Sequence, residues 1–262
     1  MTTTDWILGS VAPIRRRLKR SRVGTALAHA DIQALFPEAT TAEIEILLGV
    51  KPYTMASWEG LWAVVQSVRY VHGRGIAGDF VECGVWRGGS SMAAAMAFAL
   101  AGDTGRTLHL FDTFAGMNRP TGDDRVVGSG EQTMAKWMQT RTADDSSTWC
   151  QASMEDVLVN LARTSYPPER IRLIRGKVED TLRVAAHIPD RIAILRLDTH
   201  WYESTRAELE TLFARVTTGG VVIFDDYDHW VGAKKAIDEF LATQPPYLLN
   251  RIDDAGRLLV RV

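Results

Sequence analysis

Residues 79–91 read Asp-Phe-Val-Glu-Cys-Gly-Val-Trp-Arg-Gly-Gly-Ser-Ser. The first five residues are typical of a short buried strand, the glycines that follow predict a turn, and residues 91–100 have the composition of a helix. In open α/β sheets, ligands bind at the carboxyl ends of strands, at turns of this kind. Glycine also lets a ligand approach the backbone closely. The stretch therefore predicts an α/β sheet with a ligand site after this strand.

The chemistry of the turn indicates which ligand it would hold. Its glycine spacing differs from the Gly-x-Gly-x-x-Gly of dinucleotide sites. We expect Glu82 to hold an α-amino group and the N-terminus of the following helix to hold a carboxylate. That pair suits a zwitterionic methionine better than a pyrophosphate. The alternative is a purely structural turn.

Short apolar runs alternate with helical stretches from residue 78 onward, and each run ends near an acid or a glycine. This alternation predicts a parallel sheet with helices on both faces. The last two runs, 247–252 and 258–262, flank Asp-Asp-Ala-Gly and predict an antiparallel hairpin that closes the sheet. The predicted strands before it are 80–81, 108–111, 171–174, 192–197 and 221–224, and the predicted helices are 91–100, 203–216 and 232–241.

Three further segments organise the chain. Residues 1–50 are predicted to form a helical extension that contacts the substrate or forms a dimer, with Thr40 or Thr41 capping a helix over 42–48. Residues 58–71 have apolar positions at helical spacing after Ser57, a suitable N-cap. Residues 117–150 are rich in Gly, Asp, Ser and Thr, which indicates a lid over a site or a disordered insertion. We expect the main domain to span 51–262.

The composition excludes several classes of protein. The 262 residues are 46% hydrophobic and 24% charged, which is typical of a soluble globular chain. A net charge of −2 gives no attraction to nucleic acid or to an anionic membrane, and no apolar stretch is long enough to span one. Two cysteines provide no disulfide framework, so a cytoplasmic location is expected. The basic run at 15–22 is interpreted as a solvated helix face, and contact with a substrate or partner is the alternative.

An acid also ends the second predicted strand. Asp112 follows 108–111 and lies 30 residues after Glu82. An acid at that position can accept hydrogen bonds from both ribose hydroxyls. Sites for NAD and for S-adenosylmethionine share this placement, and a helix cap is the structural alternative. Asp112 therefore predicts a nucleoside ligand without identifying it.

Polar residues follow two further strands. Asp198 and His200 come after 192–197, while Asp225 and Asp226 come after 221–224. Both groups belong to the carboxyl edge of the sheet, where converging carboxylates repel each other unless a cation joins them. An all-oxygen set of ligands points to Mg²⁺, Mn²⁺ or Ca²⁺ rather than zinc. The alternative is that these residues are separate helix caps and surface acids.

On these residues the chain resembles the macrocin-type sugar O-methyltransferases of antibiotic biosynthesis. These enzymes have the class I methyltransferase fold, a Rossmann-like parallel sheet closed by an antiparallel hairpin. The first 50 residues match no motif of the family. The matching segments are 51–55, 78–90, 112–117, 178–182, 195–205 and 225–230.

The resemblance implies an enzyme that uses S-adenosylmethionine and Mg²⁺ to methylate a sugar hydroxyl of a glycoside or oligosaccharide. It further implies a homodimer or larger assembly. The implied cofactor-binding residues are Thr54 and Met55, which cover the cofactor; Glu82, Gly84 and Ser90 at its methionine end; Asp112 and Thr113 at the ribose; and Val178 and Glu179 at the adenine. The implied metal ligands are Asp198, Asp225 and Asp226.

His200 departs from the family pattern, which commonly has a second Asp two places after the first metal ligand. A neutral sugar hydroxyl is a poor nucleophile, so a base beside it would help. We expect His200 to be that general base, with Asp198 beside it on the same side of the chain. The alternative is that His200 only hydrogen-bonds a metal ligand.

Three rival functions remain. A catechol-type O-methyltransferase is also metal-dependent, but that group has Asp-Asn at the second acid pair and a Lys three places after the first Asp, where this chain has Asp226 and Trp201. An NAD-dependent oxidoreductase is disfavoured by the glycine spacing. A non-catalytic S-adenosylmethionine-binding protein would have no need of the acid cluster.

Overall fold

The computed structural model describes residues 29–128 and 133–262. Their contacts divide the chain into two compact units, 1–48 and 49–262, and each is considered by itself. The basic run at 15–22 and most of the predicted N-terminal extension lie outside the described residues. In the first unit, helix α2 (His29–Leu35) precedes α3 (Thr41–Val50). The predicted cap is confirmed at Thr40, which exchanges hydrogen bonds with Glu43.

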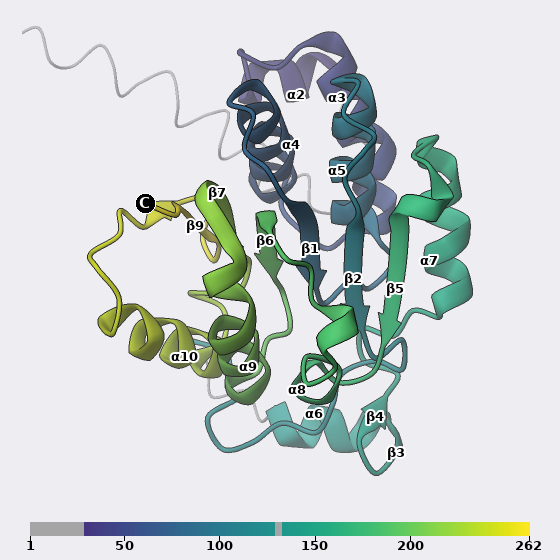
Figure 1. The fold of residues 1–262 in the computed structure, drawn as a ribbon. Helices are drawn as coiled ribbons and strands as arrows, with labels where there is room; N and C mark the ends of the chain where they lie inside the picture. Colours follow the sequence, from purple (N-terminus) through teal and green to yellow (C-terminus); the bar gives the residue numbers. More distant parts are fainter. Residues whose placement is uncertain (1–28, 129–132) are drawn as a thin grey trace, which may run out of the picture. The chain divides into compact units, whose positions relative to one another are not determined.

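The second unit is built on one seven-stranded sheet with the order β5-β2-β1-β6-β7-β9-β8 (Figure 1). The first five strands in this order are parallel, and β9 and β8 are antiparallel at one edge. The predicted parallel sheet with a closing hairpin is therefore confirmed. The strands are β1 (Asp79–Cys83), β2 (Leu108–Asp112), β5 (Ile171–Arg175), β6 (Ile192–Leu197), β7 (Val216–Phe224), β8 (Asn250–Arg251) and β9 (Arg257–Val260).

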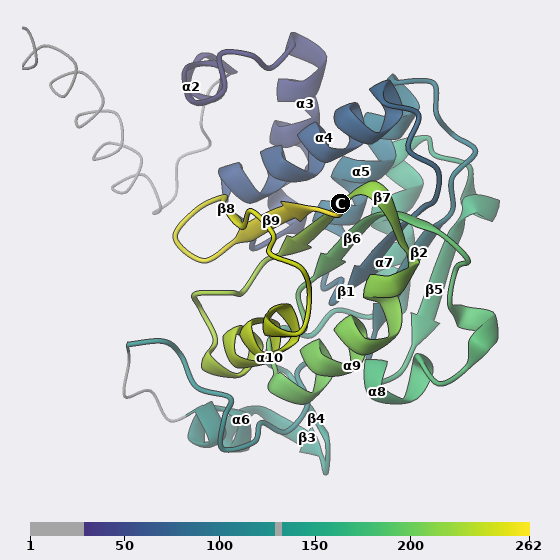
Figure 2. The ribbon, with the colours of Figure 1, turned by 60° about the vertical axis from the view of Figure 1, so that its left-hand side comes forward.

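Helices cover both faces of this sheet. One face carries α4, α5 and α7, and the other carries α8, α9 and α10 (Figure 2). Because both faces are covered, the central strands β1, β2 and β6 are almost wholly buried. All six residues of β6 are buried. The helices are α4 (Trp58–Gly73), α5 (Gly89–Leu100), α7 (Met154–Leu161), α8 (Val178–Thr181), α9 (Tyr202–Leu212) and α10 (Val231–Ala242).

Several boundaries differ from the sequence prediction, and the strand predicted over 221–224 begins already at Val216. The helix predicted over 203–216 ends at Leu212, because a 3₁₀ turn follows and Val216 already pairs with β6 as the first residue of β7. The strand predicted over 247–252 is reduced to Asn250–Arg251, since only these two residues pair with β9. Ser57 caps α4 as predicted, by accepting a hydrogen bond of 2.8 Å from the Gly60 N–H.

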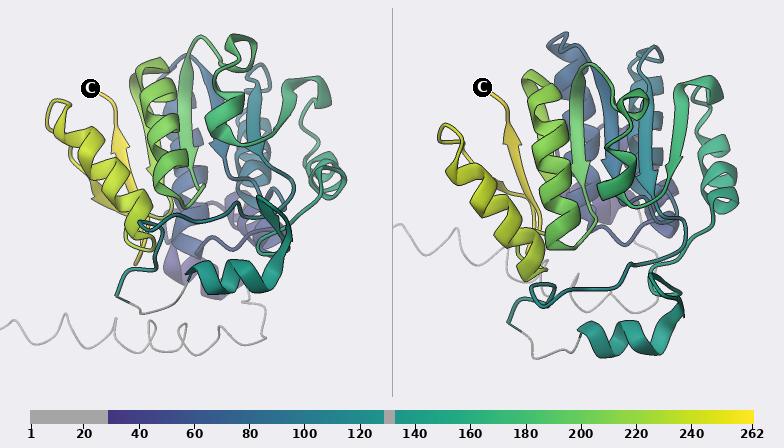
Figure 3. Two further views of the ribbon diagram at one scale, coloured as in Figure 1. Left: turned by 90° about the horizontal axis from the view of Figure 1, so that it is seen from below. Right: turned by 60° about the horizontal axis from the view of Figure 1, so that its bottom comes forward.

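The described parts of the segment 117–150 contain a helix, α6 (Thr133–Thr140), and a small hairpin of β3 (Arg141–Ala143) and β4 (Ser146–Ser147). These elements lie beyond the carboxyl ends of the parallel strands (Figure 3). An isolated bridge joins Val126 to Trp230, which follows β7. The segment is thus attached to the edge of the sheet where the predicted site residues occur. None of the described helices combines the length and apolarity needed to cross a membrane.

Candidate active site

The turn after β1 is packed directly against the end of β6. Gly84 has φ +84°, and a Cβ there would lie 2.1 Å from the backbone oxygen of Asp198. The Asp198 N–H donates to the Cys83 carbonyl at 2.8 Å. Only glycine combines this backbone conformation with so close an approach. The predicted ligand turn and the first predicted metal ligand are therefore adjacent.

Asp112 holds two turns together. Its Oδ2 accepts hydrogen bonds from the N–H groups of Val85 (2.7 Å) and Trp86 (3.1 Å), and its Oδ1 accepts one from Phe114 (2.8 Å). Thr113 donates to the Gly116 carbonyl at 2.9 Å, which closes the second turn. The carboxylate thus shapes the backbone around the end of β2. Its predicted contact with a ribose stays a prediction.

The start of α5 is covered by the chain from residues 53–55. A Cβ at Gly89 would lie 2.6 Å from both the Cβ of Thr54 and the carbonyl oxygen of Tyr53. Ser90 is buried in the first turn of α5, whereas Met55 is 58% exposed. Thr54 therefore lies against the N-terminus of α5, where a helix can attract an anionic group, and its predicted cover of the cofactor stays a prediction. Met55 is in position to contact a ligand from outside.

The predicted adenine residues begin α8. Val178 is buried in the main core. The Oε2 atom of Glu179 is buried and has no hydrogen-bond partner among the residues that the structure describes. Glu208, on the neighbouring α9, is fully buried, and burial raises the pKa of its carboxyl well above the usual range. Glu179 is thus an available acceptor of the kind that an exocyclic amine requires.

An ion-pair network that the sequence analysis missed lies behind these residues. Arg196, on β6, is 2% exposed and contacts Glu82 Oε1 at 2.6 Å, Asp198 Oδ2 at 2.8 Å and Asp225 Oδ1 at 2.7 Å. Ser91 donates to the other oxygen of Glu82. A lone arginine in an otherwise apolar strand was the available signal. Both oxygens of Glu82 are engaged, and its predicted contact with an amino group stays a prediction.

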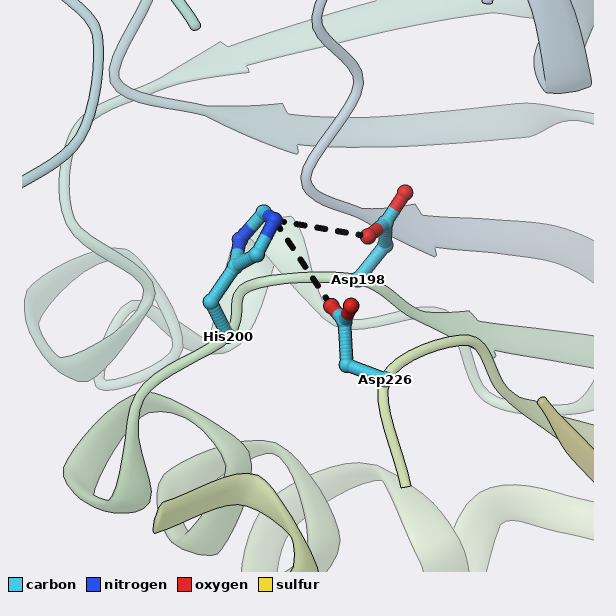
Figure 4. A group of neighbouring side chains, drawn as sticks. All are labelled: Asp198, His200 and Asp226. Atoms are coloured by element: carbon cyan, nitrogen blue, oxygen red, sulfur yellow. Dashed lines mark ion pairs between the residues drawn. The ribbon is translucent and has the colours of Figure 1, made fainter. Parts of the chain in front are cut away.

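Asp198, His200 and Asp226 form a neighbouring group, called the acid cluster below (Figure 4). Each offers one ligand atom, and the three atoms lie within 4.8 Å of one another. His200 Nε2 is 3.9 Å from Asp198 Oδ1 and 3.7 Å from Asp226 Oδ2. This trio has the residue types and spacing of a divalent-cation site.

The acids of this cluster have strongly perturbed pKa values. Burial raises the pKa of Asp226 to about 7, and the carboxylate of Asp225 adds to the effect. Burial also raises the pKa of Asp198 well above its usual range, although Arg196 opposes the shift. Acids gathered in a buried site favour their charged forms only when positive charge is brought to them.

The structure separates Asp225 from Asp226. Asp225 directs Oδ1 toward Arg196, while Asp226 faces His200. Asp226 Oδ2 is buried, and no hydrogen-bond partner for it is found within 29–128 and 133–262. Of the four residues predicted at this edge, the structure therefore brings Asp198, His200 and Asp226 into one group, with Asp225 on the guanidinium side.

Two tryptophan rings, those of Trp201 and Trp230, adjoin His200, and a third, Trp149, packs against both of them. Trp201 and Trp230 are buried and cross at a centroid distance of 5.0 Å, and Trp149 lies 6.1 Å and 5.9 Å from them. The His200 ring is 5.8 Å from that of Trp230. Burial, followed by the nearby Asp198 carboxylate, raises the pKa of Cys150 to about 11. The segment 117–150 thus contributes an apolar wall close to the acid cluster.

Comparison with known proteins places these features in a family. A family model described as Macrocin-O-methyltransferase (TylF) matches residues 48–258. A Streptomyces olivaceus protein, 8-demethyl-8-(2,3-dimethoxy-alpha-L-rhamnosyl)-tetracenomycin-C 4'-O-methyltransferase, is 34% identical over 67% of this chain. Demethyldecarbamoylnovobiocin O-methyltransferase of Streptomyces niveus is 32% identical over 72% of this chain. The matched regions span 62% of the first relative's length and 68% of the second's.

Solved structures agree with this assignment. The O-methyltransferase NovP is 32% identical, with a TM-score of 0.68 over 80% of this chain and 82% of that chain. The calicheamicin methyltransferase CalS11 is 21% identical, with a TM-score of 0.58 over 88% of this chain and 90% of that chain, and that likeness concerns the fold.

Proposed function

The chain belongs to the macrocin-O-methyltransferase family, and we propose that it transfers a methyl group from S-adenosylmethionine to a sugar hydroxyl of a glycoside or oligosaccharide. One observation carries the proposal. The cofactor's methionine end would bind at the glycine turn after β1. This turn packs at Gly84 directly against the backbone of Asp198, a member of the acid cluster. A methyl donor at the turn and an acceptor hydroxyl at the cluster would therefore be neighbours, as group transfer requires.

The cofactor would lie across the carboxyl ends of β1 and β2. The N-terminus of α5, with Ser90, would receive its carboxylate. Asp112 would accept hydrogen bonds from the ribose hydroxyls. Glu179 Oε2 would accept one from the adenine amine, and its burial without a hydrogen-bond partner in the described part of the chain supports this role. Gly84 would allow the cofactor to approach the backbone closely, and Thr54 and Met55 would cover the cofactor.

Calorimetry tests this placement. We expect S-adenosylhomocysteine to bind and NAD to produce no heat. Asp112→Ala should weaken S-adenosylhomocysteine binding by about 1.5–3 kcal/mol, the usual range for hydrogen bonds to a charged group. Asp103→Ala, which removes an acid at the opposite end of the sheet, is the matched control. Equal affinities for the two variants would refute the ribose assignment.

A divalent cation fits the residues at the acid cluster. Arg196 pairs with Glu82, Asp198 and Asp225, so Asp226 is the acid left outside this network, with its Oδ2 buried and unpartnered in the described part of the chain. We propose that Asp198 and Asp226 hold the cation and that Asp225 reaches it through its other oxygen. A bound cation, Mg²⁺ where the acids alone supply its protein ligands, would lower the pKa of the acceptor hydroxyl and orient it.

Metal removal tests this part of the proposal. Exhaustive EDTA treatment should abolish methyl transfer, and added Mg²⁺ should restore it. Asp226→Ala should abolish that rescue while S-adenosylhomocysteine still binds. Asp123→Ala, which removes an exposed acid, should behave like the unmodified protein. Full activity in protein shown by elemental analysis to be metal-free would refute the cation requirement.

The acceptor class separates this function from a catechol-type activity. Methyl transfer from labelled S-adenosylmethionine should be detected with glycosides and not with catechols. NMR of the product would identify the methylated hydroxyl. Cofactor binding without turnover on any acceptor of a broad glycoside panel would favour a non-catalytic binding protein.

A further inference from the structure

Resting on the proposed cation site, we infer that His200 Nε2 is itself a ligand of the cation, beside Asp198 and Asp226. The site then prefers a divalent transition-metal ion such as Fe²⁺, Co²⁺ or Zn²⁺ over Mg²⁺. This role differs from the general base predicted from the sequence, because a nitrogen that binds a metal has no lone pair left to accept a proton.

The two distances from His200 to the acids are those of atoms that share an ion. His200 Nε2 lies 3.9 Å from Asp198 Oδ1 and 3.7 Å from Asp226 Oδ2 (Figure 4). Both separations are too long for a hydrogen bond. Three ligand atoms that each lie about 2.0–2.2 Å from one ion are separated from each other by about 3–4 Å. The imidazole nitrogen and the two carboxylate oxygens therefore surround a point that suits a cation.

Arg196 determines which oxygens remain for that point. It binds Asp198 through Oδ2 and Asp225 through Oδ1. Asp198 is left with Oδ1 directed toward His200, and Asp226, whose Oδ2 also faces His200, completes the trio. The guanidinium thus occupies one side of the acid group, and the mixed nitrogen and oxygen set faces the other.

The backbone at His200 is held in an uncommon form that fixes the ring. His200 has φ +75°, and the Trp201 N–H donates to the Thr199 carbonyl at 2.9 Å across it. This is the strained form of the γ-turn, rare for a residue with a side chain. The rings of Trp201 and Trp230 flank the imidazole at 6.0 Å and 5.8 Å. Turn and rings together keep the imidazole beside the two acids.

The donor set determines the preference for a metal. Mg²⁺ is a hard ion that favours oxygen ligands in octahedral geometry. An imidazole nitrogen favours later first-row ions, whose affinities for such sites exceed that of Mn²⁺. One imidazole with two carboxylates therefore shifts selectivity away from Mg²⁺, whereas an Asp at position 200 would restore an all-oxygen set.

Pulsed EPR of Mn²⁺ bound to the full-length protein tests the inference. Nitrogen bound to Mn²⁺ produces a ¹⁴N modulation that changes when the protein is labelled with ¹⁵N-histidine. We expect this modulation in the unmodified protein and in His229→Asp, which removes a histidine whose ring also packs against Trp230, and we expect its loss in His200→Asp. Displacement of Mn²⁺ by Co²⁺ and by Mg²⁺ gives the preference, and the Co²⁺-to-Mg²⁺ affinity ratio should fall at least about tenfold in His200→Asp.

The outcomes separate this inference from the proposed function. Bound Mn²⁺ without a histidine modulation in the unmodified protein would overturn the inference, leave the carboxylate cation site intact and return His200 to the base role. Absence of any bound Mn²⁺ would overturn both the inference and the cation requirement. The measurement on unmodified, isotope-labelled protein stands even where His200→Asp fails to fold. Binding of S-adenosylhomocysteine monitors the cofactor site throughout.

Discussion

At the scale of single residues, Arg196 is the centre of the site's electrostatics. Its side chain is 2% exposed and that of Glu82 is 1% exposed, so both members of this ion pair are shielded from solvent. Burial raises the pKa of Glu82, and the Arg196 guanidinium opposes that rise. A buried pair adds little net stability, but removing one partner leaves the other charge uncompensated.

Arg196→Met should therefore lower the free energy of unfolding by about 3–5 kcal/mol. Urea denaturation followed by circular dichroism measures the change. Arg206→Met provides the control, because Arg206 forms ion pairs that are 49–60% exposed with Glu203 and Glu210, and such pairs contribute below about 1 kcal/mol. A cost for Arg196→Met no larger than for Arg206→Met would show that Glu82 finds another partner.

At the scale of elements, one carboxylate ties α4 to the C-terminal hairpin. Asp253 Oδ1 accepts hydrogen bonds from the N–H groups of Ala255 and Gly256, which shape the turn between β8 and β9. Ser57, the N-cap of α4, donates to Asp253 Oδ2. Burial would raise the pKa of Asp253, but the hydrogen bonds from Ser57, Gly256 and Ala255 outweigh it and hold the pKa below the usual value.

Because the folded state lowers this pKa, the stabilisation by Asp253 is present above the unfolded pKa of about 3.9 and is lost as the pH falls through the folded value. Asp253→Ala should cost about 1.5–3 kcal/mol at pH 7. The difference from the unmodified protein should shrink below about pH 4. Urea unfolding over a series of pH values measures it, with the exposed neighbour Asp254→Ala as control. A difference independent of pH would contradict a role for the charge.

At the scale of the whole second unit, the segment 117–128 is attached to the chain around the acid cluster. Asp124 is 1% exposed and accepts hydrogen bonds from Thr121 and, at 2.9 Å, from the N–H of Tyr202 at the start of α9. The Val231 N–H donates to the Arg125 carbonyl at 2.8 Å. The site therefore has a wall whose position depends on a few buried polar contacts.

Asp124→Ala should leave the N–H groups of Tyr202 and Thr121 without their acceptor, at a cost of about 1–3 kcal/mol. Hydrogen exchange of residues 117–128 should become faster, and methyl transfer should fall more than binding of S-adenosylhomocysteine. Asp123→Ala removes the adjacent exposed acid, which pairs with Lys235, and should leave exchange unchanged. Unchanged exchange in both variants would show that other contacts hold the wall.

Much of the fold and part of the site follow from the chain's local patterns. Alternating apolar runs and helices predicted the parallel sheet and its closing hairpin, and strand ends predicted that Asp198 and Asp226 lie at one edge. Boundaries of helices and strands that depend on pairing between distant strands could not be predicted from local patterns. Residue 216 continues a helical pattern in sequence, yet it pairs with Ile192 as a strand residue.

The amino-acid sequence by itself determined that acids gather at the carboxyl edge of the sheet, because periodicity fixes where each strand ends. Only the tertiary structure decided which of those acids pairs with Arg196 and which faces His200. Asp225 and Asp226 are neighbours in the turn that follows β7, yet their side chains meet different partners. Which of the two faces His200 depends on Arg196, a residue 29 positions before Asp225 that arrives from the adjacent strand. A contact between strands leaves no local pattern, so its consequence for the cation site required the folded molecule.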